Sequence, residues 1–164
     1  MKKIIVSWML ICSLFIVLAG CGNSQSSEGS DTKDTKVLKV VTNAEYAPME
    51  YMDKGELAGF DIDFAKAVAE EAGYKAEITH VGWDPLFVEV DSGRAQAGVS
   101  AVSISEERQE QYEFSVPYFL STNKILVPEG STIKNSADLE GKKVAVLNGS
   151  TGMKKIKKVL GINN

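Results

Sequence analysis

The sequence predicts an α/β protein with open parallel strands, and two patterns carry this prediction. From Val37 onward, short β-branched runs alternate with segments whose apolar residues recur at helical spacing. Gly73 and Gly93 follow two of the predicted helices, where a left-handed C-cap residue is expected. Strands that alternate with helices in this way form parallel sheets that the helices cover.

The first predicted elements are a strand and a hairpin. The β-branched run at 38–42 predicts a strand. Two apolar runs, 49–52 and 57–60, flank the polar turn residues 53–56 and predict an antiparallel hairpin. This order places a small hairpin directly after the first strand.

A helix is predicted over 61–72, because apolar residues recur there at helical spacing. Asp61 or Asp63 is expected to accept backbone N–H bonds at its N-terminal end. The residues expected on its apolar face are Phe64, Ala67, Val68 and Ala72.

The remaining segments continue the alternation. Strands are predicted at 76–81, 95–99, 125–127 and 142–147. Helices are predicted at 85–91, 105–112 and 152–160, with a short helical turn at 138–139. The strand at 125–127 is expected to leave the first folded unit and begin a second.

The N-terminus has the pattern of a secretory signal. Lys2 and Lys3 precede an apolar stretch, 4–19, that is short of the about 20 residues a membrane span needs. The Leu-Ala-Gly-Cys tetrad ending at Cys21 resembles the lipobox of bacterial lipoproteins. This resemblance implies that 1–20 is removed and that Cys21 carries palmitate-type lipid as the new N-terminus. The alternative is an uncleaved transmembrane anchor with an incidental cysteine.

The composition of the rest of the chain indicates a flexible tether followed by an exported, folded part. Residues 22–36 contain no apolar side chain, so the stretch 21–36 is predicted to be a flexible polar tether behind the lipid. Removing Lys2 and Lys3 leaves 16 of 18 basic side chains against 22 acidic ones, a formal net charge of -6. This charge argues against nucleic-acid binding. The cysteines are Cys12 and Cys21, so the mature body is expected to hold no disulfide.

Three motifs carry a family resemblance. The stretches 59–69 (GFDIDFAKAVA), 103–108 (SISEER) and 114–118 (FSVPY) resemble the polar amino-acid class, family 3, of bacterial extracellular solute-binding proteins that serve ABC importers. The resemblance implies a periplasmic-binding-protein-like fold of two α/β lobes joined by hinge strands. It implies lobe 1 over 37–121, and a hinge strand with part of lobe 2 over 122–164.

The second lobe is expected to be incomplete. Only 41 residues follow Asn123, whereas an independent α/β lobe needs on the order of 100. The resemblance also implies an acidic residue for the ligand ammonium that has no counterpart in this sequence. We therefore hypothesise a truncated or frameshifted product. Ile156 and Val159 would then lack cover, and weak stability or aggregation is expected.

A zwitterionic ligand needs a cation for its carboxylate, and Arg108 is the candidate. A guanidinium matches a carboxylate with two parallel donors, and Arg108 lies in the first turn of the predicted helix begun by Ser105. Alternatively, Arg108 pairs with neighbouring glutamates on a solvated helix. Ser103 and Ser100 are candidates for hydroxyl or backbone contacts, although a loop serine is most often a cap.

Two aromatic residues are candidate walls for the ligand side chain. Tyr46 and Trp83 each follow a predicted strand, where loops border a crevice. Alternatively, both pack as ordinary core or surface aromatics. By the resemblance, Ser150 and Thr151 of the turn before the last helix contact the ligand carboxylate, although a glycine-rich turn can be merely a turn.

Asn43 is a further candidate contact, and it bears on specificity. The resemblance implies an acid at this position in many members that bind basic or polar side chains, whereas this sequence has an amide. Strict arginine, lysine or histidine specificity is therefore not expected.

The sequence thus predicts a substrate-binding lipoprotein that captures an extracellular polar amino acid or a cystine-like solute and delivers it to an ABC permease. It is expected to be a monomer, held outside the cytoplasm on the membrane by lipid on Cys21, without cofactor or metal. No enzyme is expected, because His80 is the one histidine and no acid cluster accompanies it. The alternatives are a non-functional fragment, a ligand-sensing ectodomain and, less favoured, a dehydratase-type enzyme.

Overall fold

The computed structural model describes residues 36–162. The predicted leader, the lipid site at Cys21 and the tether up to residue 35 lie outside the described residues, and the predicted domain boundaries stay predictions. None of the helices within 36–162 is long and apolar enough to cross a membrane.

A parallel sheet organises the first part of the described chain. Its central strand is β1 (Lys36–Thr42), which pairs in parallel with β5 (Tyr74–His80) along seven residue pairs. On its other side β1 pairs with β6 (Ala97–Gly98), giving the order β5-β1-β6. The predicted α/β class with parallel strands is confirmed, although β6 is shorter than the predicted strand 95–99.

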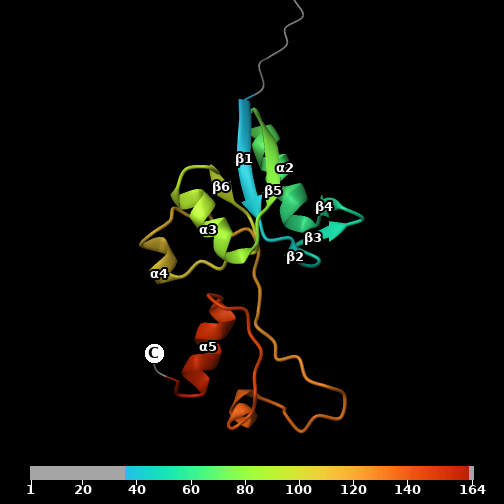
Figure 1. The fold of residues 1–164 in the computed structure, drawn as a ribbon, viewed down its shortest axis with the longest axis vertical. Helices are drawn as coiled ribbons and strands as arrows, with labels where there is room; N and C mark the ends of the chain where they lie inside the picture. The colour runs from blue at the N-terminus through green and yellow to red at the C-terminus, as the bar shows by residue number, and fades with distance from the viewer. Residues whose placement is uncertain (1–35, 163–164) are drawn as a thin grey trace, which may run out of the picture. The chain divides into compact units, whose positions relative to one another are not determined.

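Two helices connect the three strands and cover the sheet. Right-handed crossovers place α2 (Phe60–Glu71) and α3 (Trp83–Asp91) on opposite faces, because the chain moves outward from β1 to β5 and then back past β1 to β6. Figure 1 shows α3 in front of the sheet and α2 behind it. Under α3, a core of Val41, Leu86 and Ala95 excludes water.

The buried face of α2 differs from the predicted one. The residues that pack inward are Asp61, Ile62, Ala65 and Ala69, whereas Val68 is 51% exposed. The predicted face lies about one position further round the helix. Phe64 shows where that face points, because its ring stacks on Tyr118 at a centroid distance of 4.6 Å rather than lying under the sheet.

The start of α2 also corrects a prediction. Gly59 occupies the N-cap position, and no side chain caps the helix, so neither Asp61 nor Asp63 is the predicted cap. Instead the backbone of the preceding hairpin accepts the first N–H groups, with Asp61 N–H donating to the Met49 carbonyl at 2.8 Å. Gly59 has φ +122°, and a Cβ there would lie 2.4 Å from the Met49 carbonyl oxygen, so only glycine fits.

The predicted hairpin is present within a second, antiparallel sheet. Its strands are β2 (Glu45–Tyr46), β3 (Glu50–Asp53) and β4 (Glu56–Ala58), in that order. Lys54 and Gly55 both have positive φ, as a two-residue I′ turn requires. The short strand β2 is not predicted by the sequence.

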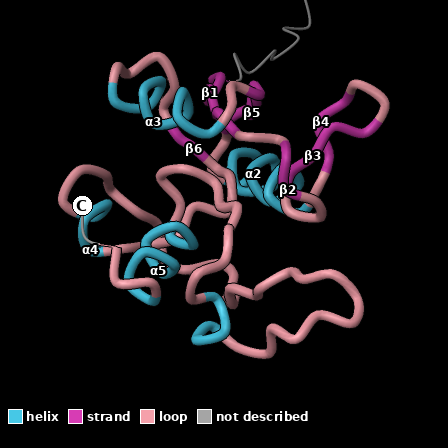
Figure 2. Tube along the Cα trace, turned by 60° about the horizontal axis from the view of Figure 1, so that its bottom comes forward, coloured by secondary structure: helices cyan, strands magenta, loops and turns pink. Residues whose placement is uncertain are grey.

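Regular structure is sparse after β6. The chain forms α4 (Glu106–Gln109), the 3-10 turn η1 (Ser136–Leu139) and α5 (Thr151–Val159). Figure 2 shows the chain between α4 and α5 as loop apart from that turn. The predicted strands 125–127 and 142–147 are wrong, because no segment within 36–162 pairs with them. The predicted helix 105–112 is reduced to about one turn.

Candidate functional site

Arg108 is positioned by the short helix α4. Ser105 is the N-cap of this helix, and its Oγ accepts the backbone N–H of Arg108 at 3.4 Å. The cap fixes where the first turn begins, which turns the Arg108 side chain inward. This side chain is only 8% exposed, the lowest value among the charged residues of α4.

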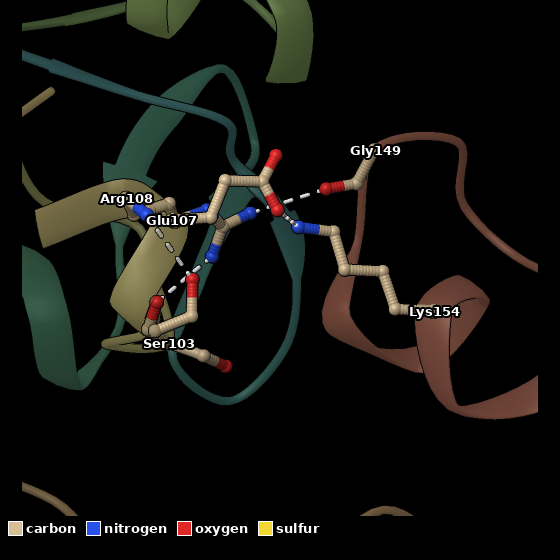
Figure 3. A network of polar contacts seen from close by, with 6 residues as sticks. Ser103, Glu107, Arg108, Gly149 and Lys154 are labelled. Atoms are coloured by element: carbon tan, nitrogen blue, oxygen red, sulfur yellow. Dashed lines mark hydrogen bonds and ion pairs between the residues drawn. The ribbon is translucent and has the colours of Figure 1, made fainter. Parts of the chain in front are cut away.

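The guanidinium is held by carbonyl groups and rings. Its Nη1 donates to the Ser103 carbonyl at 2.9 Å and its Nη2 to the Gly149 carbonyl at 3.2 Å (Figure 3). Its central carbon lies 5.3 Å from the ring centroids of both Trp83 and Phe87, within cation–π range. These neighbours orient the charge without neutralising it.

No carboxylate pairs with Arg108 in the described part of the chain. Its neighbour Glu107 instead bonds Lys154 of α5, and the other ion pair of residues 36–162 joins Arg94 to Glu89. The alternative in which Arg108 pairs with glutamates on a solvated helix is therefore wrong. Burial lowers the pKa of Arg108, an effect that the nearby charge of Glu107 partly offsets. A guanidinium nevertheless stays protonated, so the site holds a buried cation.

Trp83 begins α3 and forms one wall beside this cation. Its ring meets Phe87 edge-on at a centroid distance of 5.2 Å. A Cβ on Gly149 would lie 3.4 Å from Trp83 Nε1, so the loop before α5 approaches the indole closely. Phe87 was missed by the sequence reasoning. The signal was its spacing of four from Trp83, which puts the two rings on one face of a helix.

The turn before α5 contributes two hydroxyl groups. Ser150 is the N-cap of α5, where its Oγ accepts the Met153 N–H at 3.1 Å and donates to the Leu147 carbonyl at 2.7 Å. Thr151 Oγ1 lies 3.2 Å from Ser103 Oγ. These contacts join the loop after β6 to the start of α5, on either side of the Arg108 guanidinium.

Asn43 and Ser100 form a second, separate group. They are 6% and 3% exposed, and the Asn43 N–H donates to Ser100 Oγ at 3.0 Å. Ser100 Oγ in turn donates to the Glu50 carboxyl at 3.0 Å. No contact within 36–162 joins their side chains to Arg108. The sequence reasoning did not find Glu50, and its only signal was an acid inside an apolar strand.

Tyr46 stands apart from both groups. It lies on β2 and is 55% exposed, so it is not a core residue. Among the described residues it makes no hydrogen bond or ring contact with another candidate. The structure thus brings together Ser103, Arg108, Trp83, Ser150 and Thr151, and leaves Tyr46 at the surface.

His80 has a backbone role at the end of β5. Its Nδ1 accepts the Ala44 N–H at 3.0 Å. Across residues 36–162, no three His, Cys, Asp or Glu side chains gather closely enough to hold a metal ion.

The chain is similar to known proteins of one family. Residues 38–161 match the model of the bacterial extracellular solute-binding proteins, family 3. A probable histidine-binding protein of Neisseria gonorrhoeae is 38% identical over 100% of this chain and 62% of its own length. The arginine-binding extracellular protein ArtP of Bacillus subtilis is 33% identical over 92% of this chain and 57% of its own length.

A solved structure gives the same answer for the fold. The arginine-, lysine-, histidine-binding protein ArtJ of Geobacillus stearothermophilus superposes with a TM-score of 0.76 at 44% identity, over 78% of this chain and 55% of ArtJ. The chain spans between 55% and 62% of the length of these three proteins, and the likeness to ArtJ agrees with a periplasmic-binding-protein-like fold. The match to the family model and these identities show that the chain belongs to the bacterial extracellular solute-binding proteins of family 3.

Proposed function

We propose that this chain captures an extracellular amino acid and delivers it to the permease of an ABC importer. The observation that carries the proposal is the Arg108 guanidinium, which is buried, charged and without a carboxylate partner among the described residues. Burying an uncompensated cation is costly, so such a group is retained where a ligand supplies the anion. The named relatives are amino-acid-binding proteins, which supports an α-carboxylate as that anion.

The donors around Arg108 suit a carboxylate. Two of the five guanidinium N–H groups bond the carbonyls of Ser103 and Gly149, which leaves three for a ligand. The hydroxyl groups of Ser103 and Thr151 meet beside it, and the N-terminal end of α5 adds a partial positive charge. We assign Ser150 the role of shaping this turn, because its hydroxyl already caps α5.

The aromatic rings set the class of ligand side chain. Trp83 and Tyr46 offer apolar faces that accept a flat or a cationic group. Asn43 offers an amide in place of a charge, which favours a polar amino acid or a cystine-like solute. Ser100 is assigned a supporting role, because its hydroxyl already bonds the Glu50 carboxyl. The relatives named for histidine and arginine make these two amino acids essential members of any ligand screen.

The place of action follows from the N-terminal pattern. We propose that the chain works outside the cytoplasm, as a monomer anchored to the membrane by lipid on Cys21 after removal of 1–20. The relative named as an extracellular protein supports the location. Cys21→Ser is expected to release the chain from the membrane fraction into the medium, and retention of this variant in the membrane would argue for an uncleaved anchor.

Isothermal titration of the purified full chain with the twenty amino acids and cystine tests the binding role. We expect one class of amino acid to bind and Arg108→Ala to abolish that binding. Arg108→Lys is expected to bind weakly, because an ammonium cannot offer the two parallel donors of a guanidinium. Arg94→Ala is the matched control, since Arg94 is an exposed arginine paired with Glu89.

Three outcomes of related assays would point to the alternatives. A folded chain that binds no amino acid would favour the non-functional fragment. Chemical turnover of a bound ligand would favour the dehydratase-type enzyme. Amino-acid uptake that continues in cells without this protein, while a ligand response is lost, would favour the sensing ectodomain.

A further inference from the structure

Two carboxyl groups lie next to each other in the interior of the protein. They do not belong to the Arg108 cluster, which consists of Trp83, Ser103, Arg108, Ser150 and Thr151. Glu50 begins β3 and is 1% exposed, and Asp61 lies in the first turn of α2 and is 0% exposed. Asp61 lies close enough to Glu50 for its charge to act on that carboxyl group. No basic side chain within 36–162 forms an ion pair with either group.

One oxygen of each carboxyl group has a hydrogen-bond partner, and the other oxygen has none among the described residues. Glu50 Oε1 accepts the Ser100 hydroxyl at 3.0 Å. Asp61 Oδ2 accepts the Ala101 N–H at 2.6 Å and the Tyr118 hydroxyl at 3.1 Å. The other oxygens, Glu50 Oε2 and Asp61 Oδ1, have no partner. Two acceptor oxygens can only be joined if one of them carries a hydrogen.

Physical chemistry rules out two buried charges here. Two carboxylates in contact repel each other, and each loses its hydration, so one of them takes up a proton. Asp61 accepts two donated hydrogen bonds, which stabilise a charged carboxylate, whereas Glu50 accepts only one. Glu50 is therefore the acid of the pair and Asp61 the carboxylate.

The pair ties together three segments that are far apart in the sequence. Through Ser100, Glu50 is linked to the N–H of Asn43, directly after β1. Asp61 holds the N–H of Ala101, whose φ of 43° is unusual for a residue with a side chain. It also holds the hydroxyl of Tyr118, in the segment after α4.

We propose that Glu50 and Asp61 share a single proton and together position the loop after β1 and the loop after β6. These loops carry Asn43, Ser100 and Ser103, so the consequence for a ligand rests on the proposed function. The shared proton and the positions of the loops do not depend on the proposed function. Glu50 and Asp61 are positioning residues, since neither lies in the Arg108 cluster.

The charges around Glu50 come from few elements. Asp61 of α2 is the titratable group that acts on Glu50, and the charge of Glu50 in turn acts on the Tyr118 hydroxyl. The chain directly after β1 and the loop after β6 present the uncharged Asn43 and Ser100. The acids of the neighbouring strands point to solvent: Glu45, Asp53 and Glu56 are exposed. Burial first, and then the charge of Asp61, raises the pKa of Glu50 from 4.5 to about 8.

Because the pKa of Glu50 is raised in the folded chain, the stability of the fold depends on pH. Between about 4.5 and about 8, the folded chain holds a proton that the unfolded chain releases. The stabilisation is therefore complete below the lower value and is lost as the pH rises through the upper one. Once Glu50 ionises, the pair repels and the two loops lose their anchor.

Infrared spectroscopy of the full chain tests the proton directly. At neutral pH we expect the carbonyl band of an un-ionised carboxylic acid, which disappears as the pH rises through about 8. Glu50→Gln removes the band, whereas Glu56→Gln, on the exposed strand of the same hairpin, retains it. In Asp61→Asn the band is expected to disappear at a lower pH than in the unaltered chain, because the charge of Asp61 is gone while the burial of Glu50 remains.

Amide hydrogen exchange of the same proteins tests the positioning. On raising the pH through the loss of the band, the protection factors of Asn43 and Ala101 are expected to fall about tenfold or more in the unaltered chain, the scale of one pKa unit of coupling. In Glu50→Gln they stay constant, since the amide group keeps the hydrogen bond at every pH.

Three results would overturn the proposal. They are an absent acid band at neutral pH, a band that survives Glu50→Gln, and protection factors that do not respond when the band titrates. If Glu50→Gln does not fold, the pH titration of the unaltered chain and of Asp61→Asn still decides. A failure to bind any amino acid would count against the proposed function alone, because these measurements need no ligand.

Discussion

Residues 36–112 and residues 113–162 differ in how their β-forming sequence is used. In the first region, β1 has a partner strand on each side, and apolar residues such as Val41 and Leu86 are buried between sheet and helix. In the second region, Leu120 and Leu126 are 91% and 98% exposed. Its one buried apolar residue among those described is Leu139. A β-branched sequence therefore forms a strand only where a neighbouring strand accepts its hydrogen bonds.

The candidate site draws on both regions. Arg108 and Trp83 belong to the first region, whereas Gly149 and Thr151 belong to the second. The first region supplies the rigid support for the cation, and the second supplies a helix start and hydroxyl groups. Substitutions in each region are expected to change the stability of the chain by different amounts.

The largest effect is expected from a core truncation in the first region. Leu86 is 2% exposed, and Leu86→Ala removes its packing against Val41 and Ala95. We expect the free energy of unfolding to fall by about 2–5 kcal/mol in urea denaturation. Leu126→Ala, in the second region, is the control and is expected to change it by less than about 0.5 kcal/mol. Equal losses would show that Leu126 is buried in solution and that the two regions do not differ.

The next effect concerns the junction of the hairpin and α2. Gly59→Ala would place a methyl group 2.4 Å from the Met49 carbonyl oxygen at a φ of +122°. We expect it to destabilise the fold by about 2 kcal/mol or more beyond Gly55→Ala, which has positive φ but no atom within 4 Å. Urea denaturation compares the two, and similar values would mean that the hairpin moves freely against the helix.

A smaller effect is expected in the second region, at the start of α5. Ser150→Ala removes the side-chain cap that accepts the Met153 N–H, which costs about 1 kcal/mol of helix stability. We expect the protection factor of the Met153 amide to drop about fivefold and the amides of β1 to be unaffected. Ser150→Asp restores the cap and the protection. A matching drop in β1 would show that α5 unfolds together with the sheet.

The smallest effect is expected from the ion pair between Glu107 and Lys154, which bridges α4 and α5. Lys154 lowers the pKa of Glu107, so any stabilisation exists at neutral pH and is lost as the pH falls through that lowered pKa. Both side chains are exposed, and we expect Glu107→Gln to leave the melting temperature unchanged. Glu89→Gln, which breaks the pair with Arg94, is the control. A clear drop for Glu107→Gln alone would mean that the two regions depend on each other.

The sequence predicts the first region well because its signals are local and agree with one another. Helical spacing, terminal glycines and the two-residue turn each act over a few residues, and they place α2, β3 and β4 within two residues of their bounds. Arg108 was placed correctly in a first turn for the same reason, since Ser105 is its cap.

The errors arise where the decisive contact is distant in the sequence. The buried face of α2 depends on the sheet and on Tyr118, which lies 57 residues from Asp61 in the sequence. The strands expected at 125–127 and 142–147 lack partners, which local sequence does not reveal. Glu50 is the clearest case, because the local sequence does not predict that this carboxyl group is buried beside Asp61.

The proposed binding role depends on a contact between Arg108 and the α-carboxylate of an amino acid. The most direct measurement titrates the full chain, and Arg108→Ala, with the bound amino acid and with its methyl ester, which has lost the negative charge. We expect the unaltered chain to prefer the amino acid strongly and Arg108→Ala to bind both ligands equally weakly. If Arg108→Ala still prefers the amino acid by the same factor, another group binds the carboxylate and the proposed role of Arg108 is wrong.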